Sequence, residues 1–299
     1  KDTLNQSFDG QTFKRNHTLK RIYLGNFPIM LQSDFCVLQG LPKEVRFSMG
    51  ECKNDLGGYF IIDGKEKTVV CQEKFADNML YVKKSTDDIH LYSAEIRSVS
   101  ENISKPVRTM SVRIKAPTNK YTFKNIVVNI PNVRAPVPLF IVFRALGIIS
   151  DKSIISHCLL DMEKYESMID LFIPSVHDGS TVNNQQNALQ YIALLTKGPG
   201  GIRHALEILN DYFLPHIGED NYIEKAYYLG HIVFKLLSVY TGLEPPTDRD
   251  SFKFKRVELI GSLLNDLYRE YWSMQLHAVQ LTFEKKLYYN QEMYESNLY

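Results

Sequence analysis

Residues 57–67 read GGYFIIDGKEK, and this stretch predicts a β-hairpin. Asp63 and Gly64 stand between two runs of high strand propensity, and both residue types tolerate the positive φ angles of a two-residue hairpin turn. The first strand is expected at Tyr59–Ile62 and the second at Thr68–Cys71. The chain around this hairpin should therefore fold as a β-rich segment.

The residues before and after the hairpin extend this pattern. The Gly57-Gly58 pair permits an unusual φ angle or the close approach of another backbone segment. Residues 19–135 show mainly strand patterns, although Gly25 and Pro28 interrupt the first apolar runs. Residues 111–115 alternate polar and apolar side chains, as a half-exposed strand should.

Near residue 138 the apolar spacing becomes helical. Apolar residues recur at helical spacing over 139–146, and Gly147 follows where a C-cap glycine belongs. Asp151 can cap the next helix. Further helices are expected at 162–172, 185–195, 201–213 and 221–240, and a long helical region from about Lys255. The chain is thus predicted to have an α+β fold, with a β-rich part before a helical part.

Composition narrows the classes of function. The 299 residues suit about two domains, and 44% hydrophobic residues suffice for a sizeable core. Lys and Arg number 35 against 34 Asp and Glu, so the chain lacks the basic excess of a dedicated DNA-binding domain. Any contact with nucleic acid must come from local basic patches.

The cysteines and the chain ends suggest an intracellular protein cut from a longer one. Cys36, Cys52, Cys71 and Cys158 form no C-x-x-C pair, so we expect reduced thiols and no zinc site. No run approaches the roughly 20 apolar residues that span a bilayer. The polar N-terminus and the Tyr-rich C-terminal stretch look like cuts through a longer polypeptide.

The sequence shows none of the common motifs of enzymatic chemistry. The sequence contains no G-x-x-x-x-G-K-[ST], H-E-x-x-H or G-x-S-x-G pattern. The glycine-rich Lys197–Gly201 segment favours a turn between helices over a phosphate cradle, since no Lys-Ser/Thr follows it. The eight histidines are scattered, and structural roles account for them better than catalysis.

Two segments concentrate charge in a way that suits binding. Lys65 and Lys67 lie just beyond the hairpin turn, where they either neutralise phosphates or simply solubilise the turn. Residues 248–256 read DRDSFKFKR. Arg249 between Asp248 and Asp250 suits an ion-pair network that orients a loop, and the cations that follow suit a nucleic-acid backbone.

Five motifs resemble, in the same order, those of the second-largest subunits of multisubunit DNA-dependent RNA polymerases. They are GGYFIIDGKEK at 57–67 followed by Gln-Glu at 72–73, FRALG at 143–147, FLPH at 213–216, KAYYLG at 225–230, and DRD at 248–250 with KR at 255–256 and L-x-G-x-L-L at 259–264. The resemblance covers roughly residues 20–270 and is closest to the RNA polymerase II type. Phe254 replaces a usual glycine and Lys74 a frequent arginine. These departures, with the Asn-, Tyr- and Ile-rich composition, point to a large DNA virus.

The resemblance implies an architecture and an absence of chemistry. It implies a mixed, β-rich protrusion interrupted by an α/β lobe, followed by long helices that return to the protrusion. The implied boundaries are 1–78 for the first part of the protrusion, 79–252 for the lobe and 253–299 for the second part. The family's catalytic groups lie elsewhere, so no catalytic residue, metal or cofactor is expected here. Mg and Zn are expected elsewhere in the full polymerase.

The resemblance also implies binding partners. Lys67 and Lys74 match positively charged positions of the family motif and should approach the phosphate backbone near the RNA–DNA hybrid, with Lys65, Lys255 and Arg256 as further contributors. The expected partners are the largest and other polymerase subunits, the DNA template, the hybrid and general initiation factors, and no membrane. The expected location is the nucleus for a cellular protein, or a cytoplasmic factory or virion for a viral one. The alternative is a stand-alone protein-interaction module without polymerase context.

Overall fold

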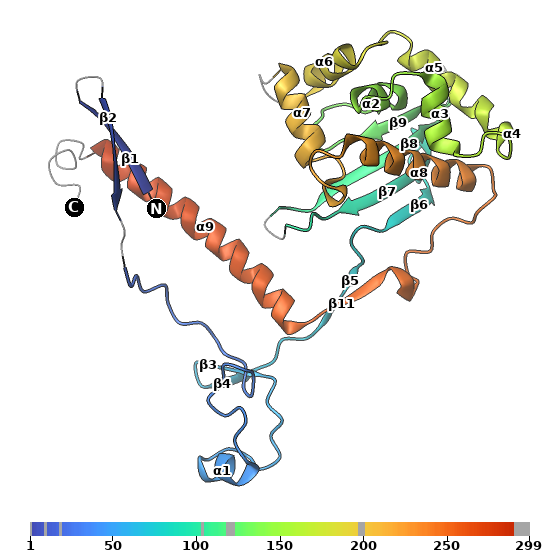
Figure 1. Ribbon diagram of the computed structural model, residues 1–299. Helices are drawn as coiled ribbons and strands as arrows, with labels where there is room; N and C mark the ends of the chain where they lie inside the picture. Colours follow the sequence, from blue (N-terminus) through green and yellow to red (C-terminus); the bar gives the residue numbers. More distant parts are fainter. Residues whose placement is uncertain are drawn as a thin grey trace. The chain divides into compact units, whose positions relative to one another are not determined.

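The computed structural model describes residues 2–8, 11–17, 20–102, 105–117, 123–196 and 201–289. The chain divides into two compact units: unit 1 is Lys1–Gln72 with Glu258–Tyr299, and unit 2 is Glu73–Val257 (Figure 1). Unit 2 is therefore inserted in the sequence between the two parts of unit 1. Helices and strands occur together, which confirms the predicted α+β class.

The centre of unit 2 is a five-stranded antiparallel sheet with the order β10-β9-β8-β7-β6. Its strands are β6 (Leu80–Lys84), β7 (His90–Ser98), β8 (Arg108–Lys115), β9 (Ile126–Asn129) and β10 (Val137–Pro138). Each strand pairs with its neighbours in sequence, so the sheet is a meander. The register places Ala94 opposite Val112, and Val112 opposite Val128.

The two faces of this sheet differ in character because side chains alternate along each strand. Ala94, Val112 and Val128 are fully buried and belong to the hydrophobic core that also includes the helices. On the other face, Glu95 and Arg113 remain partly exposed. The alternation predicted for residues 111–115 is thereby confirmed.

The helical part of unit 2 covers the apolar face. Its elements are α2 (Leu139–Ala145), α3 (Asp151–Leu159), α4 (Glu166–Ile169), η1 (Asp170–Phe172), α5 (Ile173–Gly179), α6 (Gln185–Leu195), α7 (Gly201–Asp211), η2 (Pro215–Ile217) and α8 (Tyr222–Tyr240). The α8 helix packs against β6, β7 and β8, whereas α2 packs against β9 and β10 (Figure 1). The helices expected at 185–195 and 221–240 are confirmed. The one expected at 162–172 begins only with α4 at Glu166, because residues 161–164 form a turn in which the Asp161 carboxylate accepts the Lys164 backbone N–H.

The α2 helix lies wholly within the core. All seven of its residues are buried, including Arg144. The Arg144 guanidinium donates to the carbonyl oxygens of Gly179 and Val182 and lies 2.5 Å from the Asp151 carboxylate. Gly147 follows the helix with φ 103°, which confirms the predicted C-cap glycine. The prediction that Asp151 caps α3 is wrong: Ser150 is the N-cap residue, and the Asp151 carboxylate pairs with Arg144 instead.

The α3 and α8 helices meet at a glycine. A Cβ atom on Gly230 would lie 2.8 Å from the carbonyl carbon of His157 and nearer still to its oxygen. The α3 and α8 backbones are therefore in direct contact at this point, with no side chain between them. The glycine therefore sets how closely the two helices pack, and the neighbouring Cys158 and Leu229 are buried beside it.

Unit 1 contains little regular structure before residue 59. Strands β1 (Asp2–Phe8) and β2 (Gln11–His17) pair as an antiparallel hairpin, and α1 (Lys43–Ser48) is a short helix. The apolar runs at 21–24 and 27–31 form no strand, contrary to expectation. Gly25 has φ 121° and Pro28 lacks a backbone N–H, so neither run can sustain a ladder of hydrogen bonds.

The hairpin predicted at residues 57–67 is present. Strands β3 (Phe60–Ile62) and β4 (Lys65–Lys67) pair with Ile62 opposite Lys65. Asp63 and Gly64 have φ 52° and 72°, as a turn with two positive φ angles requires. The second strand was expected at Thr68–Cys71 but begins at Lys65, because a two-residue turn returns the chain to the ladder at once.

The Gly57-Gly58 pair allows the close backbone approach that the sequence suggested. Both glycines have positive φ, 72° and 85°. The Gly58 N–H donates to the Leu31 carbonyl oxygen at 3.0 Å. A Cβ on Gly57 would lie 2.5 Å from that same oxygen, so a side chain there would displace the hydrogen bond between Gly58 and Leu31.

The second part of unit 1 is dominated by one long helix. The α9 helix spans Ile260–Tyr289, 30 residues. The helical region predicted from about Lys255 thus starts five residues later, because 255–258 instead forms strand β11. Within unit 1, the Tyr268 ring of α9 lies edge-on to Phe27, with ring centroids 6.0 Å apart. The two distant parts of unit 1 therefore share a contact.

Candidate nucleic-acid interface

The β3–β4 hairpin presents the two lysines that lie beyond its turn. Lys65 and Lys67 are both exposed and, being two residues apart on one strand, share a face of the hairpin. Neither side chain has a carboxylate within ion-pair distance in the part of the chain that the structure describes. Their charges are therefore available to an external anion.

Lys74 has a different setting in unit 2. It lies on β5 (Gln72–Phe75), where its ammonium is 3.5 Å from the Asp77 carboxylate. The Lys74 side chain is 40% exposed, and an ion pair so open to water contributes little. A phosphate can therefore compete for the Lys74 ammonium.

Lys255 and Arg256 lie on β11 (Lys255–Glu258), which pairs with β5. The Lys255 ammonium is 2.7 Å from Glu73 and 4.1 Å from the centre of the Phe75 ring. Its side chain is only 14% exposed. Arg256 is exposed and donates to the carbonyl oxygens of Lys253 and Lys255. Lys255 is thus already neutralised, whereas the Arg256 charge faces water.

The Asp248-Arg249-Asp250 loop is ordered by aromatic rings. The Arg249 guanidinium lies 4.8 Å from the centre of the Phe75 ring and 5.4 Å from that of Tyr81. No carboxylate lies within ion-pair distance of Arg249 among the described residues. The ion-pair partners expected for Arg249 are thus replaced by cation–π contacts, because β5 and β6 bring two aromatic rings beside the loop. Asp250 instead lies 4.0 Å from Lys255.

Other sequence-based candidates add nothing to this interface. The Lys197–Gly201 turn lies outside the described residues except for Gly201, the first residue of α7. Within the described ranges, no three His, Cys, Asp or Glu side chains gather as a metal site would require. No helix in those ranges is both long and apolar enough to cross a membrane.

Comparison with known proteins places the chain in a family. Residues 3–299 match the family described as RNA polymerase beta subunit. The chain belongs to the RNA polymerase beta subunit family. It is 40% identical over 261 residues to DNA-directed RNA polymerase II subunit RPB2 of Encephalitozoon cuniculi, covering 85% of this chain and 22% of the relative.

Relatives from other lineages show the same partial coverage. The chain is 36% identical over 280 residues to DNA-directed RNA polymerase II subunit 2 of Arabidopsis thaliana, covering 90% of this chain and 24% of the relative. It is 32% identical over 257 residues to DNA-directed RNA polymerase subunit Rpo2 of Sulfolobus acidocaldarius, covering 83% of this chain and 22% of the relative. The chain thus spans under a quarter of the length of these beta subunit relatives.

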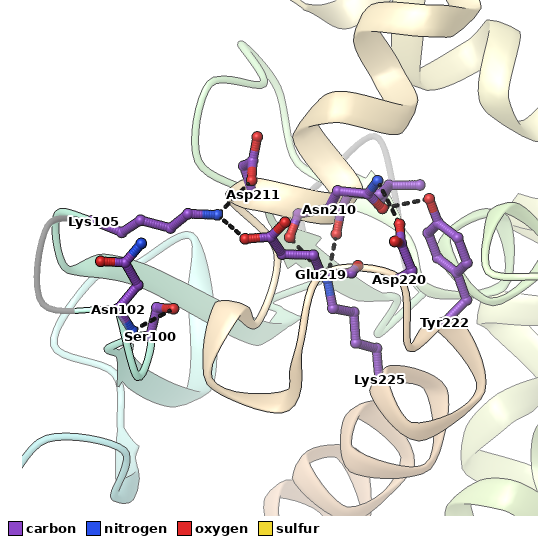
Figure 2. Close-up of polar contacts among 10 residues, drawn as sticks. Ser100, Asn102, Lys105, Asn210, Asp211, Glu219, Asp220, Tyr222 and Lys225 are labelled. Carbon is purple, nitrogen blue, oxygen red and sulfur yellow. Dashed lines mark hydrogen bonds and ion pairs between the residues drawn. The ribbon is translucent and has the colours of Figure 1, made fainter.

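One motif that resembles a polymerase sequence supplies the central residue of a polar cluster in unit 2 (Figure 2). Lys225, the first residue of KAYYLG, is fully buried, and its ammonium donates to the carbonyl oxygens of Leu209, Asn210 and Glu219 at 2.7, 3.0 and 3.1 Å. Lys105, before β8, pairs with Asp211 at 2.9 Å and with Glu219. The cluster joins the end of α7 to the start of α8, so its role is structural.

His216, the last residue of FLPH, should make the stability of unit 2 depend on pH. Its Nδ1 lies 2.7 Å from the hydroxyl of buried Ser98, and burial, with the nearby Lys225 charge, lowers the pKa of His216 below its usual 6.5. The unfolded chain then binds more protons than the folded one at acidic pH. The free energy of unfolding should therefore fall as pH drops through and below 6.5.

We expect His216→Asn to weaken this acid sensitivity, because asparagine does not titrate. The measurement is urea unfolding of the 299-residue chain at pH 7 and pH 5, with the exposed His277→Asn as control. An equal acid-induced loss in wild type and in His216→Asn would assign the sensitivity to other groups, such as His231, whose pKa is also lowered by burial.

Sequence reasoning missed one group of cations. Lys83, Arg97, Arg113 and Lys115 lie on the polar face of the unit 2 sheet. The only signal was the alternation over residues 111–115, which indicated a half-exposed strand but not what its neighbours would add. Strand pairing from β6 to β8 was needed to show that these four cations share a surface.

Proposed function

We propose that this chain is the protrusion and lobe region of the second-largest subunit of a DNA-directed RNA polymerase. In transcription it forms one wall of the DNA cleft, guides DNA and docks initiation factors. The observation that carries the proposal is the family match over residues 3–299, together with relatives that are subunits of DNA-directed RNA polymerases.

The proposed domains follow the division of the chain into units. Residues 1–78 and 253–299 are assigned to the protrusion and 79–252 to the lobe. In support, the unit boundaries at Gln72/Glu73 and Val257/Glu258 lie close to these limits. The contact between Phe27 and Tyr268 also supports a protrusion built from both parts.

Catalysis and partners are assigned to the assembled enzyme. Nucleotidyl transfer belongs to the complete polymerase, and we assign no catalytic residue, metal or cofactor to this chain. Its proposed partners are the largest and other subunits, the DNA template, the RNA–DNA hybrid and general initiation factors. The proposed location is intracellular, wherever the polymerase transcribes.

Lys67 and Lys74 are the proposed contacts to the nucleic-acid backbone. In the assembled polymerase, Lys67→Ala with Lys74→Ala should weaken binding of a DNA–RNA scaffold regardless of its sequence. If each lysine neutralises one phosphate, the slope of log affinity against log salt should become shallower by about 2. The loss in affinity should accordingly be largest at low salt.

The control variant also removes two lysine charges, but from positions outside the proposed contacts. Lys53 and Lys152 are exposed, and Lys53→Ala with Lys152→Ala should leave the slope unchanged. Co-purification with the largest subunit tests assembly before any binding measurement. Failure to assemble would contradict membership in a polymerase, whereas normal assembly with an unchanged slope would make Lys67 and Lys74 merely solvated surface residues.

A further inference from the structure

The face of the unit 2 sheet that points away from the core carries an unusual set of side chains. We call it the polar sheet face and define it by Lys83, Glu95, Arg97, Ser111, Arg113 and Lys115. These residues alternate with core residues along β6, β7 and β8, so they project to one side. Strand pairing places Lys83 and Arg113 on either side of Ser93.

Positive charge dominates the polar sheet face. Glu95 is the one carboxylate among its defining residues, 3.5 Å from Lys83 and 3.9 Å from Arg113. One carboxylate shared between two cations leaves the face strongly basic. Asp87, in the turn before β7, is a further acid near its edge. His90 adds no charge at neutral pH, because burial and the charges of Arg113 and Lys115 lower its pKa.

The hydrogen-bonding groups on this face are largely unused. Among the described residues, the Arg113 guanidinium makes no hydrogen bond, since its contact with Glu95 is 3.9 Å long. In the same ranges, no ion pair involves Arg97 or Lys115. The Ser111 hydroxyl is buried and accepts a hydrogen bond from Asn129 at 3.1 Å, so the donors available at the surface are those of the cations. Exposed Arg and Lys donors of this kind bind phosphate oxygens.

The polar sheet face also lacks what a folded protein partner needs. Within the face, the large apolar side chains of Tyr81 and Val127 are only 3% and 1% exposed, whereas Ile89, in the turn before β7, is exposed at its edge. Protein interfaces centre on buried aromatic or apolar anchors and are depleted of lysine. A surface of cations without such an anchor at its centre instead complements a polyanion. Without an exposed aromatic ring it cannot stack bases, which favours contact with the backbone alone.

We propose that the polar sheet face binds the sugar–phosphate backbone of a nucleic-acid duplex, without reading its sequence. The proposal rests on the proposed function, since the duplex is the one that the polymerase holds. It adds a second contact surface, in unit 2, to that of Lys67 and Lys74. Arg113 supplies a bidentate fork and Lys115 a point charge two residues along the same strand.

The test uses the assembled polymerase and duplex DNA extended beyond the transcription scaffold. Arg113→Ala with Lys115→Ala should make the salt slope of duplex binding shallower by about 2. Arg113→Lys with Lys115→Arg keeps the charge and should restore most of the slope. The control, Lys152→Ala with Arg203→Ala, removes two exposed cations from α3 and α7 and should leave the slope at the wild-type value.

The outcomes separate this proposal from the proposed function. A shallower slope in the Arg113/Lys115 variant alone, with normal assembly, supports the polar sheet face. A wild-type slope in an assembled variant overturns it, even where the Lys67/Lys74 variant behaves as expected. A wild-type slope with lost binding of an initiation factor also overturns it and assigns the face to an acidic protein. If the double alanine variant does not assemble, the charge-neutral pair Arg113→Gln with Lys115→Gln replaces it under the same criteria.

Discussion

Alanine at Gly230 is expected to lower the free energy of unfolding of the chain by roughly 3 kcal/mol. The added Cβ would lie 2.8 Å from the His157 carbonyl carbon, and this neighbour is backbone, so no side chain can rotate away. The α3 and α8 helices must separate, and the buried contacts of Cys158 and Leu229 must loosen with them. Urea unfolding followed by circular dichroism measures the loss.

Gly261→Ala is the matched control for this change. Gly261 also lies in a helix, α9, but a Cβ there meets no atom within 4 Å. Alanine is the better helix former, so this variant should be as stable as wild type or slightly more stable, by up to about 1 kcal/mol. If Gly230→Ala also matches wild type, the two helices do not pack as closely as the structure shows.

Lys225→Met should cost roughly 3 kcal/mol of unfolding free energy. Methionine keeps most of the volume, but the three carbonyl oxygens of Leu209, Asn210 and Glu219 lose their shared donor. Two of these oxygens belong to the last turn of α7, where no helical N–H can replace the ammonium. Lys235→Met is the control: Lys235 lies on the same helix in a part-exposed pair with Glu244 and should cost under about 1 kcal/mol.

Lys225 should also make the stability of the chain depend on pH in the alkaline range. Burial lowers the pKa of Lys225 from 10.5 to about 8. Between these values the unfolded chain retains the proton that the folded chain releases. The free energy of unfolding of the wild type should therefore rise relative to that of Lys225→Met as pH increases above 8. Parallel pH profiles for the two proteins would show that Lys225 does not titrate in this window.

The features that the sequence predicted correctly depend on neighbours in the chain. The turn at Asp63-Gly64 and the helix end at Gly147 follow from φ preferences of single residues. The α6 and α8 helices follow from apolar spacing over two or more turns. Local chemistry suffices in each case, because no distant segment is needed to satisfy the backbone.

The predictions that failed depend on partners far away in sequence. Residues 255–258 carry a pattern compatible with a helix start, yet they form β11 because β5 offers an edge to pair with. Arg249 stands between two aspartates, yet its guanidinium meets Phe75 and Tyr81, which lie about 170 residues earlier. Neither partner can be identified by reading the neighbourhood of the residue itself.

The candidate site shows the same division. The exposure of Lys65 and Lys67 follows from their place beyond a tight turn, which a single motif reveals. The polar sheet face gathers cations from three strands whose register only the folded sheet defines. Lys225 belongs to a motif that the sequence shows, but its burial among three carbonyl oxygens depends on how α7 ends beside α8.

The pairing of β5 with β11 has an evolutionary consequence. The first and last residues of unit 2 lie on hydrogen-bonded neighbouring strands, so the unit enters and leaves its host chain at one place. A module whose two ends lie side by side can be gained, lost or exchanged by a gene without leaving a gap in the rest of the chain that other residues would have to close. Lineages that enlarge, shrink or replace residues 73–257 can therefore do so while the flanking sequence drifts independently.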